Sequence, residues 1–286
     1  MKQAYLFTLL IALVAGAAGG WMVAPAGTAS TQEESVFDRV LRTGTIRCGY
    51  YVYPPMTQRD SNTNEMSGIA VDLMKRLGDS LSLKVEWAEE VTFGNMFAGL
   101  DAGRYDALCT PTWPSSAAGR VSLFSRPLFY TAVMAYVRSD DTRFDNSTLA
   151  SFDDSSVRLA VEEGDPVASA VAVQLPKATL VTLPVDAVAG AVELEVITGK
   201  ADVTFIDRNR ARHFMLSNPG ALKEVGGGQP LQVYPFRLAV PQNEHSLNAL
   251  FDTALEEAQN DGFMARLIDK HDPDHLFLRV SPPYLK

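Results

Sequence analysis

The stretch Asp106–Tyr130, DALCTPTWPSSAAGRVSLFSRPLFY, decides the fold. It begins as a short apolar strand and then reaches Thr110–Pro114, which contains two prolines. Because proline has no amide hydrogen to donate, we expect neither a helix nor a central strand to include this segment. Ser115 and Ser116 can cap a short helical turn after it, and a second apolar run starts at Leu128. A strand leading into a loop of hydroxyl and aromatic groups is typical of a ligand site in an open α/β sheet, although an ordinary strand-to-helix turn has the same pattern.

Composition limits the class of protein. The chain has 286 residues, of which 47% are hydrophobic, so one large or two medium domains are expected. The net charge is −9 and no basic stripe with interleaved aromatic residues occurs, which argues against nucleic acid as a partner. The short basic run Arg208–Arg212 is interpreted as a solvated helix face. The histidines show no metal-ligand spacing and no nucleophile–base arrangement is visible, so we expect no metal, no cofactor and no catalytic residue.

The first 30 residues differ from the rest of the chain. Lys2 precedes an uncharged stretch from Ala4 to Ala24, and small residues follow at Ala24–Ala26. A basic start, a short apolar core and small residues are typical of a secretory signal peptide. The stretch is also long enough to span a bilayer if it stays uncleaved. Residues 1–30 are therefore interpreted as a signal peptide, with an N-terminal membrane anchor as the alternative, and the remainder as exported.

The rest of the chain alternates strands and helices in two series. This order predicts parallel sheets with right-handed crossovers, in which the ends of the strands line up on one edge. Gly49 is expected to stop the first strand, and Asp165 to cap a helix that begins with Pro166. Residues 221–229 are expected to form a loop and Ser246–Ile268 one long helix. Strands are expected at Thr45–Cys48, Leu83–Trp87, Ala107–Cys109, Val157–Val161, Thr179–Leu183, Val203–Ile206 and Tyr234–Val240.

From about Leu41 to about His271 the chain resembles the bacterial extracellular solute-binding proteins of family 3, the amino-acid type. The resemblance rests on a set of short motifs in a fixed order: Leu41–Gly49, Tyr53–Pro55, Gly68–Leu73, Leu100–Ala107, Phe124–Tyr130, Gly199–Asp207 and Asn260–Phe263. It implies a two-lobe α/β fold of the type II periplasmic-binding-protein class, with a hinge of two crossing strands and a cleft between the lobes. Lobe I is expected to comprise residues 31–132 and 239–286, and lobe II residues 133–238.

The resemblance also assigns roles at the cleft. Tyr53 would stack on the ligand, Phe93 would wall the site, and Thr110, Thr112 and Trp113 would contact the ligand. Asp207 stands where an acidic residue of the second lobe takes a ligand amine.

Two departures from the family pattern bear on the ligand. The position of the arginine that grips a ligand carboxylate falls on Ala118, and Gly164–Asp165 replaces a Gly-Thr or Gly-Ser pair. A carboxylate needs a cation or free amide donors. We therefore expect an amine-bearing or cationic ligand rather than an amino acid clamped by arginine.

Several interpretations remain open at this level. Trp113 and Asp207 either form a cation-recognising site with Tyr53 or serve as hinge packing and as a helix cap. Arg126 either replaces the lost arginine or lies on the surface. Cys48 and Cys109 lie on two strands that are neighbours in such a fold. They therefore either form a disulfide or remain two buried thiols.

The sequence thus predicts an exported, periplasmic and monomeric binding protein that delivers a small solute to the membrane subunits of an ABC importer and catalyses nothing. The alternatives are a membrane-anchored sensing or accessory domain of the same fold, and an enzyme resembling the cyclic-dienyl dehydratases. The missing arginine argues against the enzyme, because its substrate is a dicarboxylate.

Overall fold

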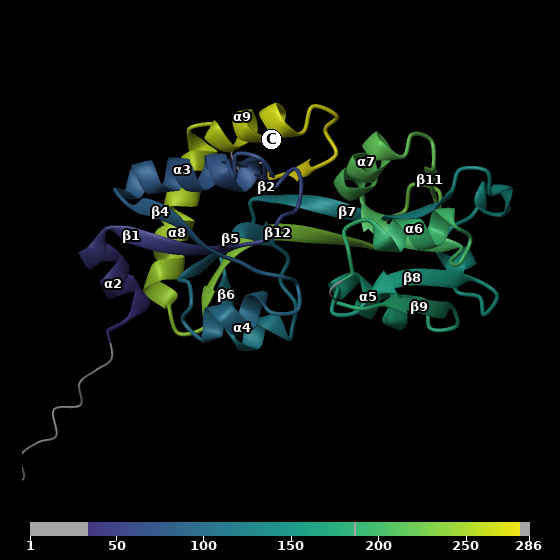
Figure 1. Ribbon diagram of the computed structural model, residues 1–286, viewed down its shortest axis with the longest axis horizontal. Helices are drawn as coiled ribbons and strands as arrows, with labels where there is room; N and C mark the ends of the chain where they lie inside the picture. Colours follow the sequence, from purple (N-terminus) through teal and green to yellow (C-terminus); the bar gives the residue numbers. More distant parts are fainter. Residues whose placement is uncertain (1–33, 186, 281–286) are drawn as a thin grey trace, which may run out of the picture. The chain divides into compact units, whose positions relative to one another are not determined.

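Figure 1 shows the fold of the protein in a computed structural model that describes residues 34–185 and 187–280. The expected signal peptide or anchor, residues 1–30, lies outside the described residues. Within the described ranges, no helix is both long and apolar enough to cross a membrane.

A continuous path of paired strands runs through both lobes (Figure 1). In order across the path, the strands are β4 (Lys84–Glu90), β1 (Thr45–Tyr50), β5 (Ala107–Thr112), β12 (Gln232–Pro241), β7 (Phe129–Arg138), β10 (Val203–Asp207), β8 (Arg158–Glu162) and β9 (Thr179–Leu183). In lobe I, β1 is parallel to both β4 and β5. In lobe II, β8 is parallel to both β9 and β10. The mixed two-lobe α/β fold expected from the sequence is therefore confirmed.

Two long antiparallel strands, β7 and β12, connect the lobes. Residues Gln232–Phe236 of β12 pair with β7, whereas Arg237 and Ala239 pair with β5 of lobe I. Short strands complete the edges: β6 (Ser122–Phe124) pairs with β12, and β11 (Leu222–Val225) and β13 (Leu278–Arg279) pair with β7. The strand β12 thus changes partner in mid-course, which makes it a hinge element.

Helices cover both faces of each sheet (Figure 1). In lobe I, α3 (Ile69–Leu81), α8 (His245–Asn260) and α9 (Phe263–His271) pack together on one face, and α4 (Met96–Asp101) covers the other. Lobe II carries α5 (Pro166–Gln174), α6 (Ala191–Ile197) and α7 (Arg208–Ser217), and α2 (Val36–Thr43) packs at the start of lobe I. The core lies between these helices and the sheets, as the apolar residues of α3 illustrate: Ile69, Ala70, Leu73, Met74 and Leu77 recur at helical spacing and all are buried.

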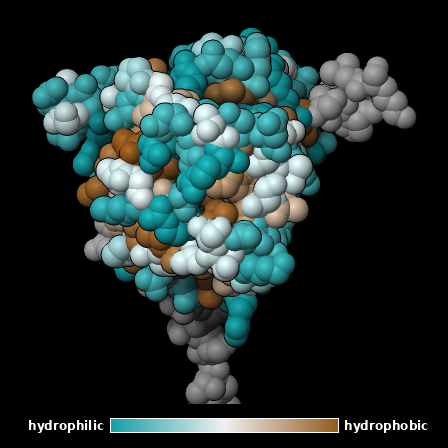
Figure 2. Space-filling model, turned by 90° about the vertical axis from the view of Figure 1, so that its right-hand side faces the viewer, coloured by the Kyte–Doolittle hydropathy of each residue, from teal (hydrophilic) through white to brown (hydrophobic). Residues whose placement is uncertain are grey.

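The lobe II face turned to the viewer in Figure 2 is mostly hydrophilic, and its apolar side chains are interspersed with polar ones. Exposed apolar residues of lobe II include Val173, Val188 and Leu216. Scattered single apolar side chains of this kind are normal for a protein surface and need no binding partner to explain them.

The cysteines form a disulfide. Cys48 on β1 and Cys109 on β5 are bonded, with their Cα atoms 5.4 Å apart. The bond joins adjacent strands of lobe I, which confirms the disulfide interpretation over that of two buried thiols.

Several strand boundaries differ from those expected, and two of the differences have a clear cause. The strand β1 continues through Gly49 to Tyr50, because this glycine serves close packing rather than termination: a Cβ atom there would lie 2.5 Å from the ring of Tyr105. The strand β5 includes Pro111, so the expectation that the proline segment lies outside a strand was wrong. Neither neighbouring strand pairs with Pro111 itself, and its missing amide donor therefore costs no ladder hydrogen bond.

Two further expectations need correction. The long C-terminal helix is two helices, because Gly262 has a φ of 76° and ends the regular backbone between α8 and α9. Residues 221–229 contain β11 before the glycine turn, and the C-terminal tail contains β13. Both short strands exist because β7 offers them a partner, which no local pattern reveals. The caps were predicted correctly: Asp165 accepts a hydrogen bond from the Val167 amide and Pro166 is the first residue of α5.

Candidate functional site

The carboxyl ends of the parallel strands of both lobes meet at the cleft. From lobe I come Tyr53, which follows β1, and Trp113, which follows β5. From lobe II come Glu162 at the end of β8 and Asp207 at the end of β10. The Tyr53 hydroxyl donates a hydrogen bond to Oδ2 of Asp207, which joins the two lobes directly. This edge is where open α/β sheets bind their ligands.

Aromatic rings form the lobe I side of the site. The rings of Phe93 and Trp113 stack at 5.9 Å with an interplanar angle of 29°, and Tyr53 meets Trp113 edge-on at 6.1 Å. The ring of Tyr234, on the hinge strand β12, lies 6.0 Å from Trp113. The sequence placed Tyr53, Phe93 and Trp113 here; Tyr234 was expected only as part of a strand. Trp113 lines the site and also packs against Phe236 of the hinge, so it does take part in hinge packing, and its role in recognising a cation stays a prediction.

Asp207 both caps a helix and faces the cleft. Its Oδ1 atom accepts hydrogen bonds from the amides of Asn209 and Arg210 at 3.0 and 3.1 Å, and its Oδ2 atom accepts the bond from Tyr53. Burial raises the pKa of Asp207, although these donors oppose the increase. Burial and the charge of Asp207 together raise the pKa of the Tyr53 hydroxyl. Asp207 is thus a buried carboxyl group, and the Tyr53 hydroxyl is a neutral donor of a hydrogen bond to it.

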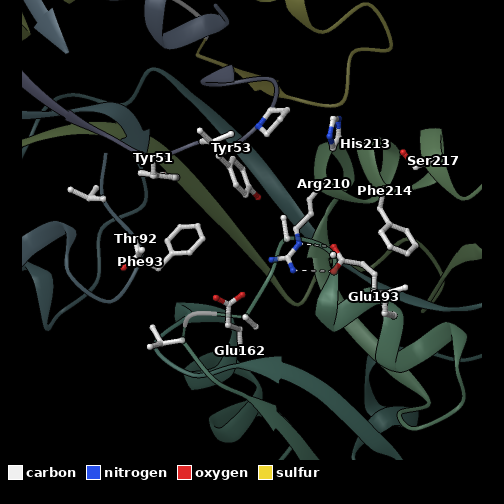
Figure 3. Close-up of a pocket in the computed structure, with 18 of the residues that line it drawn as sticks. Tyr51, Tyr53, Thr92, Phe93, Glu162, Glu193, Arg210, His213, Phe214 and Ser217 are labelled. Atoms are coloured by element: carbon white, nitrogen blue, oxygen red, sulfur yellow. Dashed lines mark hydrogen bonds and ion pairs between the residues drawn. The ribbon is translucent and has the colours of Figure 1, made fainter. Parts of the chain in front are cut away.

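Two more carboxylates of lobe II lie at the same edge. Burial raises the pKa of Asp165, and the nearby charge of Asp207 adds to this effect. Burial likewise raises the pKa of Glu162, which in Figure 3 points from the end of β8 toward the space between Phe93 and Arg210. These carboxylates lack a full set of compensating charges, so a positive charge placed among them would favour their ionised forms.

A cation is nevertheless present in the cleft. Arg210, in the first turn of α7, forms a two-pronged ion pair with Glu193 of α6, with Nε–Oε1 and Nη2–Oε2 distances of 2.6 and 3.1 Å (Figure 3). Burial alone would lower the pKa of Arg210, but the charge and hydrogen bonds of Glu193 outweigh it and the pKa is raised.

The interpretation of residues 208–212 as a solvated helix face was therefore wrong for Arg210, which is largely buried. The available signal was its position: it stands three residues after the strand-end aspartate, on the turn that faces the same edge. Its neighbours Arg208 and Arg212 pair with Glu224 and Asp274.

Two cavities adjoin at the site. A void of about 20 Å³ lies among Tyr53, Trp113, Asp165, Asp207 and Tyr234. A chamber of about 560 Å³ shares Tyr53 and Arg210 with it. In Figure 3, Tyr53, Phe93 and Glu162 border this chamber on one side and Arg210, Glu193 and Phe214 on the other. The void has room for about one water molecule, so a larger solute enters it only when the lobes separate or side chains rotate.

The other residues singled out from the sequence lie elsewhere. Thr110 is fully buried and its hydroxyl bonds to Thr57 and to the backbone of Tyr51, away from both cavities. Thr112 is also fully buried and lines neither cavity. These two remain candidates for ligand contact only through a rearrangement of β5.

The structure also places Ala118, which stands at the position of the family's arginine, and Arg126, its possible replacement. Ala118 lies buried in the short 3-10 helix Ala118–Arg120, where its amide donates to the Ser115 hydroxyl at 3.1 Å. Arg126 forms an ion pair with Glu256 of α8 at 2.8 Å. It therefore lies on the outer side of lobe I and does not replace the lost arginine. Among the residues that the structure describes, no group of three or more His, Cys, Asp or Glu could hold a metal ion.

Comparisons with known proteins agree with this geometry. Residues 46–273 match the model of the bacterial extracellular solute-binding proteins, family 3. A Haemophilus influenzae protein described as a probable amino-acid ABC transporter-binding protein is 27% identical over 237 residues, which cover 81% of this chain and 86% of that protein. An L-cystine-binding protein of Bacillus subtilis is 23% identical over 223 residues, covering 76% and 77% respectively.

Among solved structures, that of an ancestral amino acid-binding protein, described as a precursor of cyclohexadienyl dehydratase, superposes with a TM-score of 0.70 at 22% identity. It covers 83% of this chain and 99% of that chain. The fold and the site define a two-lobe protein that binds a small solute in a cleft. The chain belongs to the bacterial extracellular solute-binding proteins, family 3.

Proposed function

We propose that this protein captures a small amine-bearing or cationic solute between its lobes and delivers it to the membrane subunits of an ABC importer. The observation that carries the proposal is the charge of the cleft. Five carboxylates are found among the described residues that line the two cavities, those of Glu90, Glu162, Asp165, Glu193 and Asp207. The guanidinium that lines both cavities, that of Arg210, is already paired with Glu193, and Glu90 is paired with Arg59. A cationic group would restore the balance, and the aromatic faces of lobe I suit it as well.

The ligands of the relatives fit the amino-acid class. One relative is described as an amino-acid transporter-binding protein and another as an L-cystine-binding protein. An amino acid carries the ammonium group that the carboxylates of the cleft favour. In this protein we propose that Asp207 and Asp165 take that ammonium group, with Tyr53, Phe93 and Trp113 around it, and that no reaction follows.

The rest of the proposal concerns the whole chain. We propose that residues 1–30 are a cleaved signal peptide, that the mature protein is periplasmic and monomeric, and that lobe I comprises residues 31–132 and 239–286 and lobe II residues 133–238. The partner change of β12 between Phe236 and Arg237 supports the second boundary. The mass of the purified exported protein tests the first point: a mature chain that begins near residue 27 supports it, and retention of Met1 in a membrane fraction favours an anchored sensor.

Thermal unfolding in the presence of amino acids tests the ligand class. We expect L-arginine, L-lysine or L-ornithine to raise Tm by roughly 5–10 °C at a hundredfold excess over Kd, because a ligand that binds only the folded state stabilises it. L-glutamate and L-aspartate should have much smaller effects. Selective stabilisation by the acidic amino acids would contradict the proposal.

A matched pair of variants shows whether the cleft is responsible for binding the cationic ligand. Asp207→Asn removes the charge but keeps a good helix cap, because asparagine caps as well as aspartate. We expect it to weaken binding of the cationic ligand by about 10–100-fold, the value of a hydrogen bond to a charged group. Asp154→Asn is the control: Asp154 is exposed and precedes β8, at the opposite end of that strand from the cleft.

A further inference from the structure

Two buried hydrogen-bond donors of the void have no acceptor among the described residues. One is the indole Nε1 of Trp113, a residue that is only 7% exposed. The other is the hydroxyl of Thr131, a residue 1% exposed on the hinge strand β7. Both residues line the void beside Asp165 and Asp207. Buried polar groups almost always have a partner, so two orphaned donors that line one void call for an explanation.

The two donor residues share a neighbour, Tyr234. Thr131 on β7 is paired with Tyr234 across the hinge strands, and the ring of Tyr234 lies 6.0 Å from that of Trp113. Thr131 and Trp113, which follows β5, therefore reach the same void beside Tyr234 from different parts of the chain. An indole nitrogen can only donate, and a threonine hydroxyl can donate as well as accept. The group that satisfies both is an acceptor oxygen.

We propose that Trp113 and Thr131 form a subsite for an acceptor oxygen of the solute, on the hinge side of the two aspartates. This inference rests on the proposed function and narrows it. The carboxylates bind the amine of the solute, and the two donors bind an oxygen of its carboxylate or carboxamide group. The ligand is thus an amine that also carries an acceptor oxygen, and a bare polyamine lacks half of the recognised groups.

The arrangement also accounts for the arginine that lobe I has lost at Ala118. A carboxylate oxygen held by an indole N–H and a hydroxyl needs no cation from that loop. Arg210 lines the same void and supplies positive charge from lobe II while it stays paired with Glu193. The remainder of the solute extends into the chamber of about 560 Å³.

Paired ligands with and without the oxygen test this subsite. The probes are L-arginine with agmatine and L-lysine with cadaverine, because each pair differs only by the carboxylate. We expect the wild-type protein to bind each amino acid at least about tenfold more tightly than its decarboxylated partner, as measured by calorimetric titration. In both Thr131→Val and Trp113→Phe, this preference should shrink several-fold. In Thr131→Val, binding of the amines should change little, because Thr131 contributes only the hydroxyl of the proposed subsite.

Controls separate the subsite from general damage. Thr131→Val is nearly isosteric and removes an unpartnered buried hydroxyl, so its ligand-free Tm should stay the same or rise. Thr182→Val, at an exposed position of β9, should leave the preference unchanged.

Equal binding of amino acids and amines by the wild-type protein would overturn the inference and leave the cationic function standing. An unchanged preference in both Thr131→Val and Trp113→Phe would also overturn it. Failure of all four probes to bind, with binding of acidic amino acids instead, would overturn the proposed function itself.

Discussion

At the amino ends of their parallel strands, lobe I and lobe II carry the same structure, a buried aspartate between two arginines. In lobe I, Asp106 precedes β5, accepts from the Arg47 amide of β1 at 2.7 Å, and pairs with the guanidinium groups of Arg47 and Arg39. The Asp106 amide in turn donates to the Arg47 carbonyl at 2.8 Å. This aspartate thus fixes the start of β5 against β1.

Lobe II repeats the arrangement residue for residue. Asp202 precedes β10, accepts from the Arg158 amide of β8 at 2.9 Å, and pairs with the guanidinium groups of Arg158 and Arg143. Its amide donates to the Arg158 carbonyl at 2.8 Å. Both aspartates come from the same short motif of a glycine, a basic residue, one variable residue and an aspartate, which appears as Gly103–Asp106 and Gly199–Asp202.

The carboxyl ends of the same strands differ. Lobe I ends in Tyr53 and Trp113, whereas lobe II ends in Glu162, Asp165 and Asp207. One lobe therefore brings aromatic faces to the cleft and the other brings negative charge. The comparison teaches that the amino ends carry the shared fold and the carboxyl ends carry the recognition.

Removing the shared aspartate should have the largest effect on stability. In Asp106→Ala the arginines lose a fully buried partner, and we expect a loss of about 3–5 kcal/mol in the free energy of unfolding, measured with urea. Asp202→Ala should cost less, about 1–3 kcal/mol, because the arginine side chains are 58% and 42% exposed there but only 25% and 33% in lobe I. Equal losses in the two variants would show that exposure of the arginines does not matter.

The disulfide is the next difference between the lobes. It links β1 to β5 in lobe I, whereas in lobe II the Thr204 hydroxyl of β10 donates to the Ala160 carbonyl of β8 at 3.1 Å. The sequence separation of 61 predicts a stabilisation of about 4 kcal/mol by the chain-entropy argument. Urea unfolding of the Cys48→Ala, Cys109→Ala double variant measures it. Titration of two free thiols in the purified, unreduced protein would refute the bond itself.

The two ends of lobe II should respond oppositely to pH. The arginine partners outweigh the burial of Asp202 and lower its pKa, so its stabilisation is present above the unfolded pKa and is lost as pH falls through the folded value. The pKa of Asp207 is raised, so its contribution is present below the unfolded pKa and is lost as pH rises through the folded value. Without ligand, Asp202→Asn should therefore weaken the acid dependence of unfolding.

Asp207→Asn should change the high-pH side of the same dependence of the free energy of unfolding on pH. The asparagine does not ionise, so the ligand-free variant should lose less stability than the wild-type protein as the pH rises. Urea unfolding between about pH 4 and about pH 8 measures both sides of this dependence. The opposite pH responses of Asp202 and Asp207 would be contradicted if both variants changed the pH dependence of unfolding in the same direction.

Much of the fold could be predicted from the sequence, because its periodic strands and helices are locally determined. The buried face of α3 and the Asp165–Pro166 cap follow from spacing and capping rules. The strands β11 and β13 could not be predicted, because each depends on pairing with β7. Gly49 was misread because its role depends on Tyr105, a residue distant in the sequence.

The site was predicted unevenly for the same reason. Tyr53, Trp113 and Asp207 stand at strand ends, and their positions on one edge follow from the topology. Thr110 and Thr112 belong to the same segment but are fully buried and line neither cavity. Arg210 and Thr131 were missed, since a basic helix turn and a threonine within an apolar strand acquire meaning only when the lobes are assembled around one void.

The most direct test of the central claim is the pH dependence of ligand affinity. Calorimetric titration of the wild-type protein with L-arginine between about pH 5 and about pH 7 leaves the charges of the ligand nearly unchanged. Because the cleft carboxylates have raised pKa values and must ionise to hold a cation, we predict that affinity rises with pH and that binding releases protons. An affinity that falls as pH rises, or binding of L-glutamate in preference to L-arginine, would contradict the account.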